Sequence, residues 1–181
     1  LTGLVPPPSY FPQNVLMNIK GYESLDEVMQ RGSQALSPEA FEAAANETEA
    51  LVLDVREAQT FANGFIPNAI NIGINGSFAS WVGTLIPDLK QPILLVTEAG
   101  KEEEAITRLA RVGYDNCIGY LQGGMEAWKE AGKEVDTVTS ISAEAFSNLL
   151  AADPTIAAFD VRKKSEYDSE HVIGVENLPL D

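Results

Sequence analysis

The residues best placed to do chemistry lie in the loop at 97–102, whose sequence is Thr-Glu-Ala-Gly-Lys-Glu. The loop follows the apolar run Leu94–Val96 and leads into a segment with helical spacing. Backbone N–H groups converge at such a junction and usually bind an anion. Here Glu98 and Glu102 bring negative charge, and Thr97 supplies a hydroxyl that is not ionised at neutral pH. The loop therefore has a shape suited to anions but neither the charge nor the nucleophile to use them.

Short apolar runs alternate with helical segments, and this order must position the loop. We expect strands at 51–57, 70–74, 92–97 and 117–121. We expect helices from Pro38, with Ser37 as N-cap, and at 77–86, 102–114 and 125–130, with one or two helical turns at 25–31. The alternation predicts an α/β fold, a parallel sheet flanked by helices on both faces.

Composition excludes several classes of function. The net charge of −15, from 27 acidic and 12 basic residues, argues against nucleic acid and anionic membranes as partners. No apolar run approaches the ~20 residues of a transmembrane helix. One Cys and one His exclude a disulfide framework and a Cys- or His-rich zinc site in this chain. We expect a cytoplasmic protein.

Residues 141–181 repeat residues 36–75 at an offset of roughly one domain, about 106 residues. The matching stretches are LSPEAF (36–41) with ISAEAF (141–146), Asp54-Val55-Arg56 with Asp160-Val161-Arg162, and Asn71 with Asn177. An offset of this size indicates a tandem duplication rather than a short structural repeat.

These motifs resemble the rhodanese (sulfurtransferase) family over residues 36–135 and again over 138–181. The resemblance is carried by the two Asp-Val-Arg motifs, by HVIGVENLPL (171–180) and by GYDNCIGYLQGGMEAWKEAG (113–132). It implies a rhodanese-like domain at 36–136 and the N-terminal part of a second at 137–181. In active relatives a Cys opens the loop as Cys-x-x-Gly-x-Arg, and its thiolate holds sulfane sulfur as a persulfide.

Compared with that pattern, the loop of this chain is degenerate. Thr97 stands at the Cys position, and Glu98 and Glu102 stand where basic residues are common. A Thr cannot form a persulfide, and the same loss excludes the phosphatase chemistry of related folds. We therefore expect no catalytic residue in the degenerate loop, which consists of Thr97, Glu98, Ala99, Gly100, Lys101 and Glu102. The first copy is interpreted as a pseudo-enzyme.

The remaining motif residues are expected to be structural. Arg56 and Arg162 follow Asp54 and Asp160 by two residues, which favours an ion pair over a ligand contact. His171 is expected to be a hydrogen-bonded structural His, and its counterpart in the first copy is Phe65. Core positions are expected for Phe41, Phe61, Trp81, Cys117 and Trp128.

Residues 1–35 are expected to form a proline-rich extended arm, because Pro6–Pro8 favour extended backbone. LTGLVPPPSYFPQNVLMN (1–18) resembles the segment that joins a metallo-β-lactamase-fold domain to rhodanese domains in bacterial persulfide dioxygenase-type fusions. The resemblance implies an upstream domain with Fe or Zn, while this chain has no His-x-His-x-Asp-His run and no cofactor of its own. The implied partners are that upstream domain and the downstream remainder of the second rhodanese domain, with a homodimer left open.

The leading interpretation is a non-catalytic spacer, docking or dimerisation element of such a persulfide-handling fusion. One alternative is sulfurtransferase activity, through Cys117 or completed by the missing part of the second domain. Another is a free-standing module that binds a basic protein partner through the acidic loop. These alternatives stay open at the level of the sequence.

Overall fold

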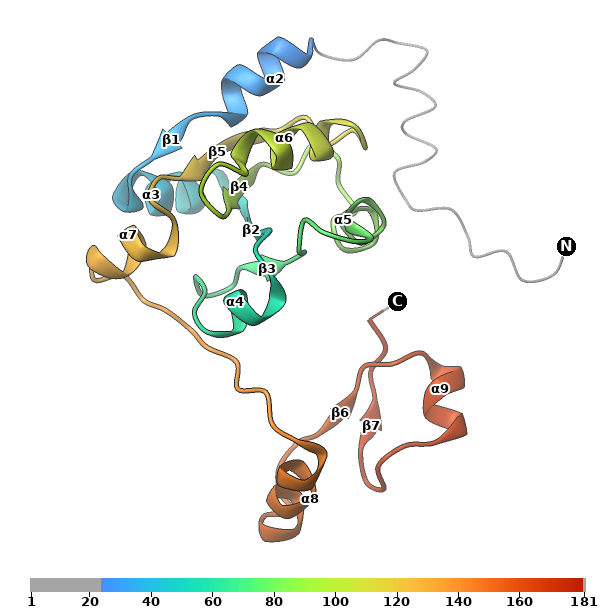
Figure 1. The fold of residues 1–181 in the computed structure, drawn as a ribbon. Helices are drawn as coiled ribbons and strands as arrows, with labels where there is room; N and C mark the ends of the chain where they lie inside the picture. The colour runs from blue at the N-terminus through green and yellow to red at the C-terminus, as the bar shows by residue number, and fades with distance from the viewer. Residues whose placement is uncertain (1–23, 181) are drawn as a thin grey trace, which may run out of the picture. The chain divides into compact units, whose positions relative to one another are not determined.

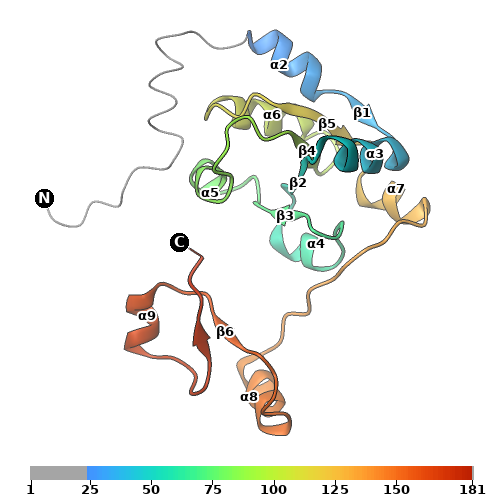
Figure 2. The ribbon, with the colours of Figure 1, turned by 180° about the vertical axis from the view of Figure 1, so that it is seen from behind.

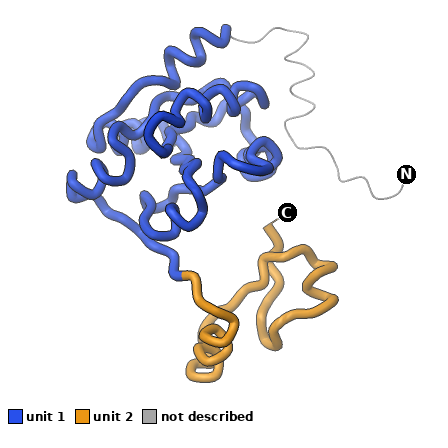
Figure 3. The backbone as a smooth tube through the Cα atoms, viewed as in Figure 1, with its two compact units in different colours: residues 1–139 blue, residues 140–181 orange. Residues whose placement is uncertain are grey.

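The computed structural model describes residues 24–180 of the chain. The chain divides into two compact units, Leu1–Thr139 and Ser140–Asp181, each described here by itself (Figure 3). Most of the proline-rich arm, residues 1–23, lies outside the described residues. None of the described helices is both long and apolar enough to cross a membrane.

Unit 1 is built on a parallel five-stranded sheet with the strand order β1-β5-β4-β2-β3 (Figure 1). The central strand β4 is buried on both faces, as its uninterrupted apolar sequence requires. In chain order the elements are α2 (Leu25–Gly32), β1 (Ala35–Leu36), α3 (Pro38–Thr48), β2 (Leu51–Asp54), α4 (Ala58–Ala62), β3 (Ile70–Asn71), α5 (Phe78–Leu85), β4 (Ile93–Val96), α6 (Glu102–Ala110), β5 (Cys117–Leu121) and α7 (Gly124–Glu130).

Helices cover both faces of this sheet, which Figures 1 and 2 show from opposite sides. On one face α2, α5 and α6 bury Val28, Val82 and Ile106 against the sheet. On the other face α3 and α7 bury Phe41 and Trp128, whose rings meet edge to face at 6.1 Å. The expected fold, a parallel sheet flanked by helices on both faces, is confirmed.

Some elements differ from the sequence patterns. The sequence patterns do not predict β1 or α4, because segments of two and five residues are too short to show the spacing of apolar residues that marks a strand or a helix. Helix α6 ends at Ala110 instead of 114, since Gly113 has a φ of 87°, a left-handed conformation that favours glycine. Core placement of Trp81 is wrong: this side chain is 43% exposed on α5.

Helix α2 and strand β1 lie within the segment expected as an arm, yet they pack into unit 1. Ser24 caps α2 by accepting the N–H of Glu27 at 3.2 Å. Val28 is only 1% exposed and belongs to the same core cluster as Ile106. The tightly packed part of unit 1 therefore begins before residue 36.

Unit 2 has few elements and almost no core. It contains α8 (Ala143–Ala152), β6 (Phe159–Asp160), α9 (Lys164–Ser169) and β7 (Glu176–Asn177). β6 and β7 pair in parallel as a two-stranded sheet. Among the described apolar residues of this unit only Val175 is buried. Within residues 140–180, unit 2 thus has secondary structure but hardly any buried apolar side chains.

Candidate functional site

The degenerate loop, residues 97–102, leaves the carboxyl end of β4 and enters α6. Thr97, 7% exposed, is the first residue after the strand. The chain then turns tightly, with the Lys101 N–H donating to the carbonyl of Glu98 at 3.0 Å. Gly100 makes this turn possible, because its φ of 81° strains any residue with a Cβ. The strand–turn–helix geometry expected from the sequence is therefore present.

Thr97 lies close to two neighbouring strands, β4 and β2, and to the start of helix α7. Val96 pairs with Asp54 in the parallel register, and its carbonyl accepts the N–H of Val55 at 2.9 Å. The carbonyl of Thr97 lies 3.8 Å from where a Cβ on Gly124, the first residue of α7, would stand. Ligands of open α/β sheets bind at the carboxyl ends of the strands. Thr97 thus lies at the edge of the sheet where ligands of such folds bind.

The basic residues Lys101 and Arg108 are both paired with Glu104 in the first turn of α6. The Gly100 N–H donates to Oε1 of Glu102 at 3.2 Å, so the loop's own carboxylate takes this donor. Lys101 Nζ donates to Glu104 at 2.8 Å, and this hydrogen bond is the main cause that lowers the pKa of Glu104. Arg108 pairs with Glu104 at 2.7 Å and also donates to the carbonyl of Ile74 at 2.7 Å. The nearby cations are therefore engaged by carboxylates.

Sequence reasoning missed this Lys101–Glu104–Arg108 network. Its signal was nevertheless available, because the three residues are spaced i,i+3 and i,i+4 along the start of α6, where side chains face each other.

A small recess borders the loop, with a volume of about 60 Å³. Its lining residues are Val55, Glu57, Ile74, Asn75, Glu98 and Lys101. Asn75 Nδ2 donates to Oε1 of Glu57 at 2.6 Å. With two carboxylates and a Lys that already pairs with Glu104, this recess offers an oxyanion little attraction.

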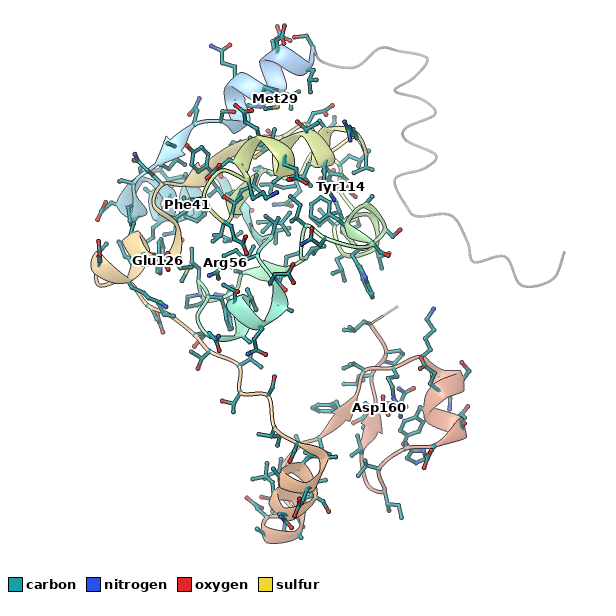
Figure 4. The ribbon with its side chains drawn as sticks, in the orientation of Figure 1. Met29, Phe41, Arg56, Tyr114, Glu126 and Asp160 are labelled. Carbon is teal, nitrogen blue, oxygen red and sulfur yellow. The ribbon has the colours of Figure 1, made fainter. Side chains whose placement is uncertain are left out.

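The Arg56 side chain is bonded on several sides inside unit 1 (Figure 4). Its guanidinium lies 2.6 Å from Oδ2 of Asp54 and donates to the carbonyl of Gly64 at 2.9 Å. Asn71 Nδ2 donates to the carbonyls of both Asp54 and Arg56, at 2.9 and 3.0 Å. Asp54 is fully buried and Arg56 is 8% exposed. The expected ion pair between Asp54 and Arg56 is present.

Unit 2 repeats this arrangement. Arg162 lies 2.6 Å from Oδ2 of Asp160 and donates to the carbonyl of Glu170 at 2.8 Å. Asn177 Nδ2 donates to the carbonyls of Asp160 and Arg162, both at 2.9 Å. The hydrogen bonds from Arg162 are the main cause of the lowered pKa of Asp160.

His171 also makes local contacts. Its Nδ1 lies 2.8 Å from the carbonyl of Tyr167, and the two rings stack at 3.8 Å. Phe65 stacks on Phe61 in the same way at 4.1 Å in unit 1. The expected hydrogen bond of His171 is present. Unit 1 has Phe65 at the position that corresponds to His171, and the ring stacking is the same there.

Cys117 lies in a different strand from the one that leads into the loop, and its thiol is a poor nucleophile. It lies in β5 with no exposed surface, and burial raises its pKa from 9.0 to about 11. A thiol of this kind is protonated at neutral pH, whereas a sulfur nucleophile must be a thiolate. Among residues 24–180, no group of three His, Cys, Asp or Glu side chains could hold a metal ion.

Comparison with known proteins shows which proteins have similar sequences and folds. The chain is 32% identical over 81 residues to thiosulfate sulfurtransferase GlpE of Shewanella oneidensis, a match that covers 44% of this chain and 76% of that protein. An uncharacterized protein of Buchnera aphidicola subsp. Schizaphis graminum is 28% identical over 83 residues, 46% of this chain; the chain thus spans 56% of that relative's length.

Among solved structures, the solution NMR structure of a rhodanese-like domain from Anabaena sp. has a TM-score of 0.50 at 19% identity. The match covers 62% of this chain and 86% of that one, and at this identity it supports the fold alone. Residues 37–131 match the family model described as a rhodanese-like domain. The chain therefore belongs to the rhodanese-like domain family.

Proposed function

We propose that unit 1 is a non-catalytic rhodanese domain. The observation that carries this proposal is Thr97, which stands at the carboxyl end of β4 where the reacting sulfur of a rhodanese would be held. Sulfur transfer from thiosulfate requires a thiolate that attacks the sulfane sulfur and releases sulfite, leaving a persulfide. A hydroxyl offers no such thiolate, and the carboxylates of Glu98 and Glu102 disfavour an approaching anion.

The proposed setting is a bacterial fusion that handles persulfide or sulfane sulfur. In it, residues 1–35 would follow a metallo-β-lactamase-type domain with Fe or Zn, and residues 137–181 would begin a second rhodanese-like domain. Unit 1 would serve as spacer, docking or dimerisation element. Support comes from the arm's resemblance and from the matching Asp-Arg-Asn hydrogen bonds of the two units.

A thiosulfate:cyanide sulfurtransferase assay between pH 6 and pH 9 tests the proposal. We expect the chain to form thiocyanate no faster than the uncatalysed reaction. Thr97→Cys supplies the missing thiol, and we expect intact-mass analysis after thiosulfate treatment to show one added sulfur atom on this variant only. Turnover by the unaltered chain would overturn the proposal.

Cys117→Ser is the matched control for the competing sulfurtransferase route. If the unaltered chain turned over and Cys117→Ser did not, Cys117 would carry the sulfur. The buried thiol, with a pKa of about 11, makes us expect identical background rates for both proteins.

A further inference from the structure

A cavity of about 280 Å³ lies in unit 1, on the face of the sheet that α3 and α7 cover. The turn before β3 contributes Ile66 and Asn68 to its lining, which places the cavity toward the amino ends of β2 and β3. Thr97 instead follows the carboxyl end of β4. Because all strands of this sheet are parallel, the cavity and the degenerate loop lie toward opposite ends of the strands.

The lining of the cavity combines a buried apolar part with a polar part. The buried part consists of Phe41, Val52, Ile66 and Trp128, which are at most 9% exposed. The polar part consists of Glu42, Asn46, Asn68 and Glu134. None of the described lining residues is Lys, Arg or His. The cavity therefore offers oxygen acceptors and negative charge next to an aromatic and aliphatic surface.

The polar side chains of the lining have few partners inside the protein. Within residues 24–180, the side chains of Asn46, Asn68 and Glu134 have no hydrogen-bond partner. Glu42 accepts Nζ of Lys133 through Oε2, and its Oε1 has no partner in the same part of the chain. A ligand in the cavity can therefore bond to two carboxylates and two amides without breaking bonds of the fold.

Asn68 has a backbone conformation that its counterpart in unit 2 reaches with glycine. The Ala69 N–H donates to the carbonyl of Ile66 at 3.0 Å, and Asn68 within this turn has a φ of 65°. The corresponding turn of unit 2, closed at 3.2 Å, has Gly174 with a φ of 87°. A positive φ strains a residue with a Cβ, although Asn tolerates it better than most. What Asn68 supplies and glycine cannot is an amide at the cavity.

We infer that this cavity binds a guanidinium group on a short apolar stem, the chemistry of an arginine side chain. Two carboxylates and no lining cation favour a positive ligand and charge-assisted hydrogen bonds. A guanidinium presents five N–H donors in one plane, so it can use several of these acceptors at once. It is also less strongly hydrated than an ammonium and stacks on aromatic rings, which suits a surface that contains Phe41 and Trp128.

The size of the cavity agrees with this class of ligand. Its volume of about 280 Å³ lies just below the range of about 300–1,000 Å³ that is usual for pockets holding drug-sized ligands and cofactors. A group of the size of one side chain therefore fits better than a cofactor. The inference concerns a site apart from Thr97 and does not depend on whether unit 1 transfers sulfur.

The test follows the indole N–H signals of the two Trp residues by NMR. Trp128 lines the cavity and donates from Nε1 to the carbonyl of Glu134 at 2.8 Å, whereas Trp81 lies on α5. Butylguanidinium is titrated into the 181-residue protein, and Trp81→Phe assigns the two signals. We expect a saturable shift of the Trp128 signal only. Butylurea, an uncharged analogue of the same shape, should cause no saturable shift. No shift with butylguanidinium, or equal binding of butylurea, would overturn the inference.

Two variants test the polar lining separately from the fold. Asn68→Gly and Glu134→Gln should each weaken butylguanidinium binding about tenfold, because each removes an acceptor for a charged donor. Asn68→Gly should fold as well as the unaltered chain, since unit 2 makes this turn with Gly174. Glu103→Gln is the matched control, because it removes one negative charge from the exposed surface of α6, on the other face of the sheet. Unchanged affinity in both lining variants, or an equal loss in Glu103→Gln, would contradict the inference.

Two further probes identify the source of the guanidinium group. Free arginine presents it as a small molecule, and the blocked tripeptide acetyl-Gly-Arg-Gly-amide presents it from a peptide backbone. Tighter binding of the tripeptide assigns the cavity to an arginine side chain of a protein partner, and tighter binding of free arginine assigns it to a small molecule. If neither probe shifted the Trp128 signal, the inference would be wrong. None of these readouts involves thiocyanate, so this inference and the proposed function fail separately.

Discussion

The Asp-Val-Arg motif occurs twice in this molecule with the same bonds but in different surroundings. Asp54 with Arg56 and Asp160 with Arg162 each form a 2.6 Å contact between the guanidinium and the carboxylate. Yet the Arg56 side chain is 8% exposed and that of Arg162 is 48% exposed. The motif and its nearest turn suffice to form this Asp–Arg pair, called the clamp below. The clamp of unit 1 is buried by strands and helices that the described part of unit 2 does not have, and this burial determines most of its contribution to the free energy of unfolding.

The largest expected effect comes from breaking the buried clamp. Asp54→Ala leaves Arg56 buried without its carboxylate, and loss of such a partner costs about 3–5 kcal/mol in the free energy of unfolding. Urea denaturation followed by Trp fluorescence measures this, because both Trp residues, Trp81 and Trp128, lie in unit 1. Asp160→Ala is the matched control and should leave that transition unchanged, since its clamp is solvated. An equal loss in both variants would contradict the role assigned to burial.

The next effect concerns Cys117, in a strand that has no counterpart in unit 2. Its pKa is raised by burial from 9.0 to about 11, so the folded state favours the protonated thiol. The resulting stabilisation is complete below pH 9 and is lost as the pH rises through 11, a decrease of roughly 3 kcal/mol. Unfolding free energies of the unaltered chain and Cys117→Ala, measured from pH 8 to pH 11, should therefore converge. Parallel curves would mean that the thiol titrates normally.

The smallest effect concerns the helix caps, which are the same in both units. Ser37 accepts the N–H of Ala40 at 3.3 Å, and Ser142 accepts that of Ala145 at 3.1 Å. Ser37→Ala should lower the unfolding free energy of unit 1 by about 1 kcal/mol. Ser142→Ala should instead act locally and speed amide exchange in α8 without shifting the unit 1 transition. A shift of that transition by Ser142→Ala would show that the two units unfold together.

The sequence predicts best where a local pattern decides the structure. Cys117–Leu121 is a strand with the predicted bounds, and Ser37 caps α3 as its position before Pro38 indicates. The loop at Thr97 and the pairing of Arg56 also follow from local motifs. Each of these features depends on a few residues that are close together in the sequence, so a short sequence pattern is enough to predict it.

Features that depend on distant partners could not be predicted in this way. β1 is a strand only because Ala35 and Leu36 pair with Tyr120 and Leu121 of β5. Trp81 looks like a core residue by composition, but α5 turns it outward while Phe78 and Val82 face the sheet. Nothing in the Asp-Val-Arg motif itself shows that only one of its two copies is buried. These outcomes are set by packing between segments far apart in the chain.

The position of β5 in the sheet has a consequence for the order in which unit 1 acquires its structure. β5 is the last strand of this unit to be synthesised, yet it inserts between β1 and β4. The first strand, β1, therefore finds its pairing partner only after residues 117–121 have left the ribosome, whereas α2 can already contact α6. Until then the growing chain exposes the edge of β4, and the pairing of β1 with β5 is distant in sequence and slow to close. A pause in translation before β5 would prolong this aggregation-prone stage, whereas a pause after α7 would not.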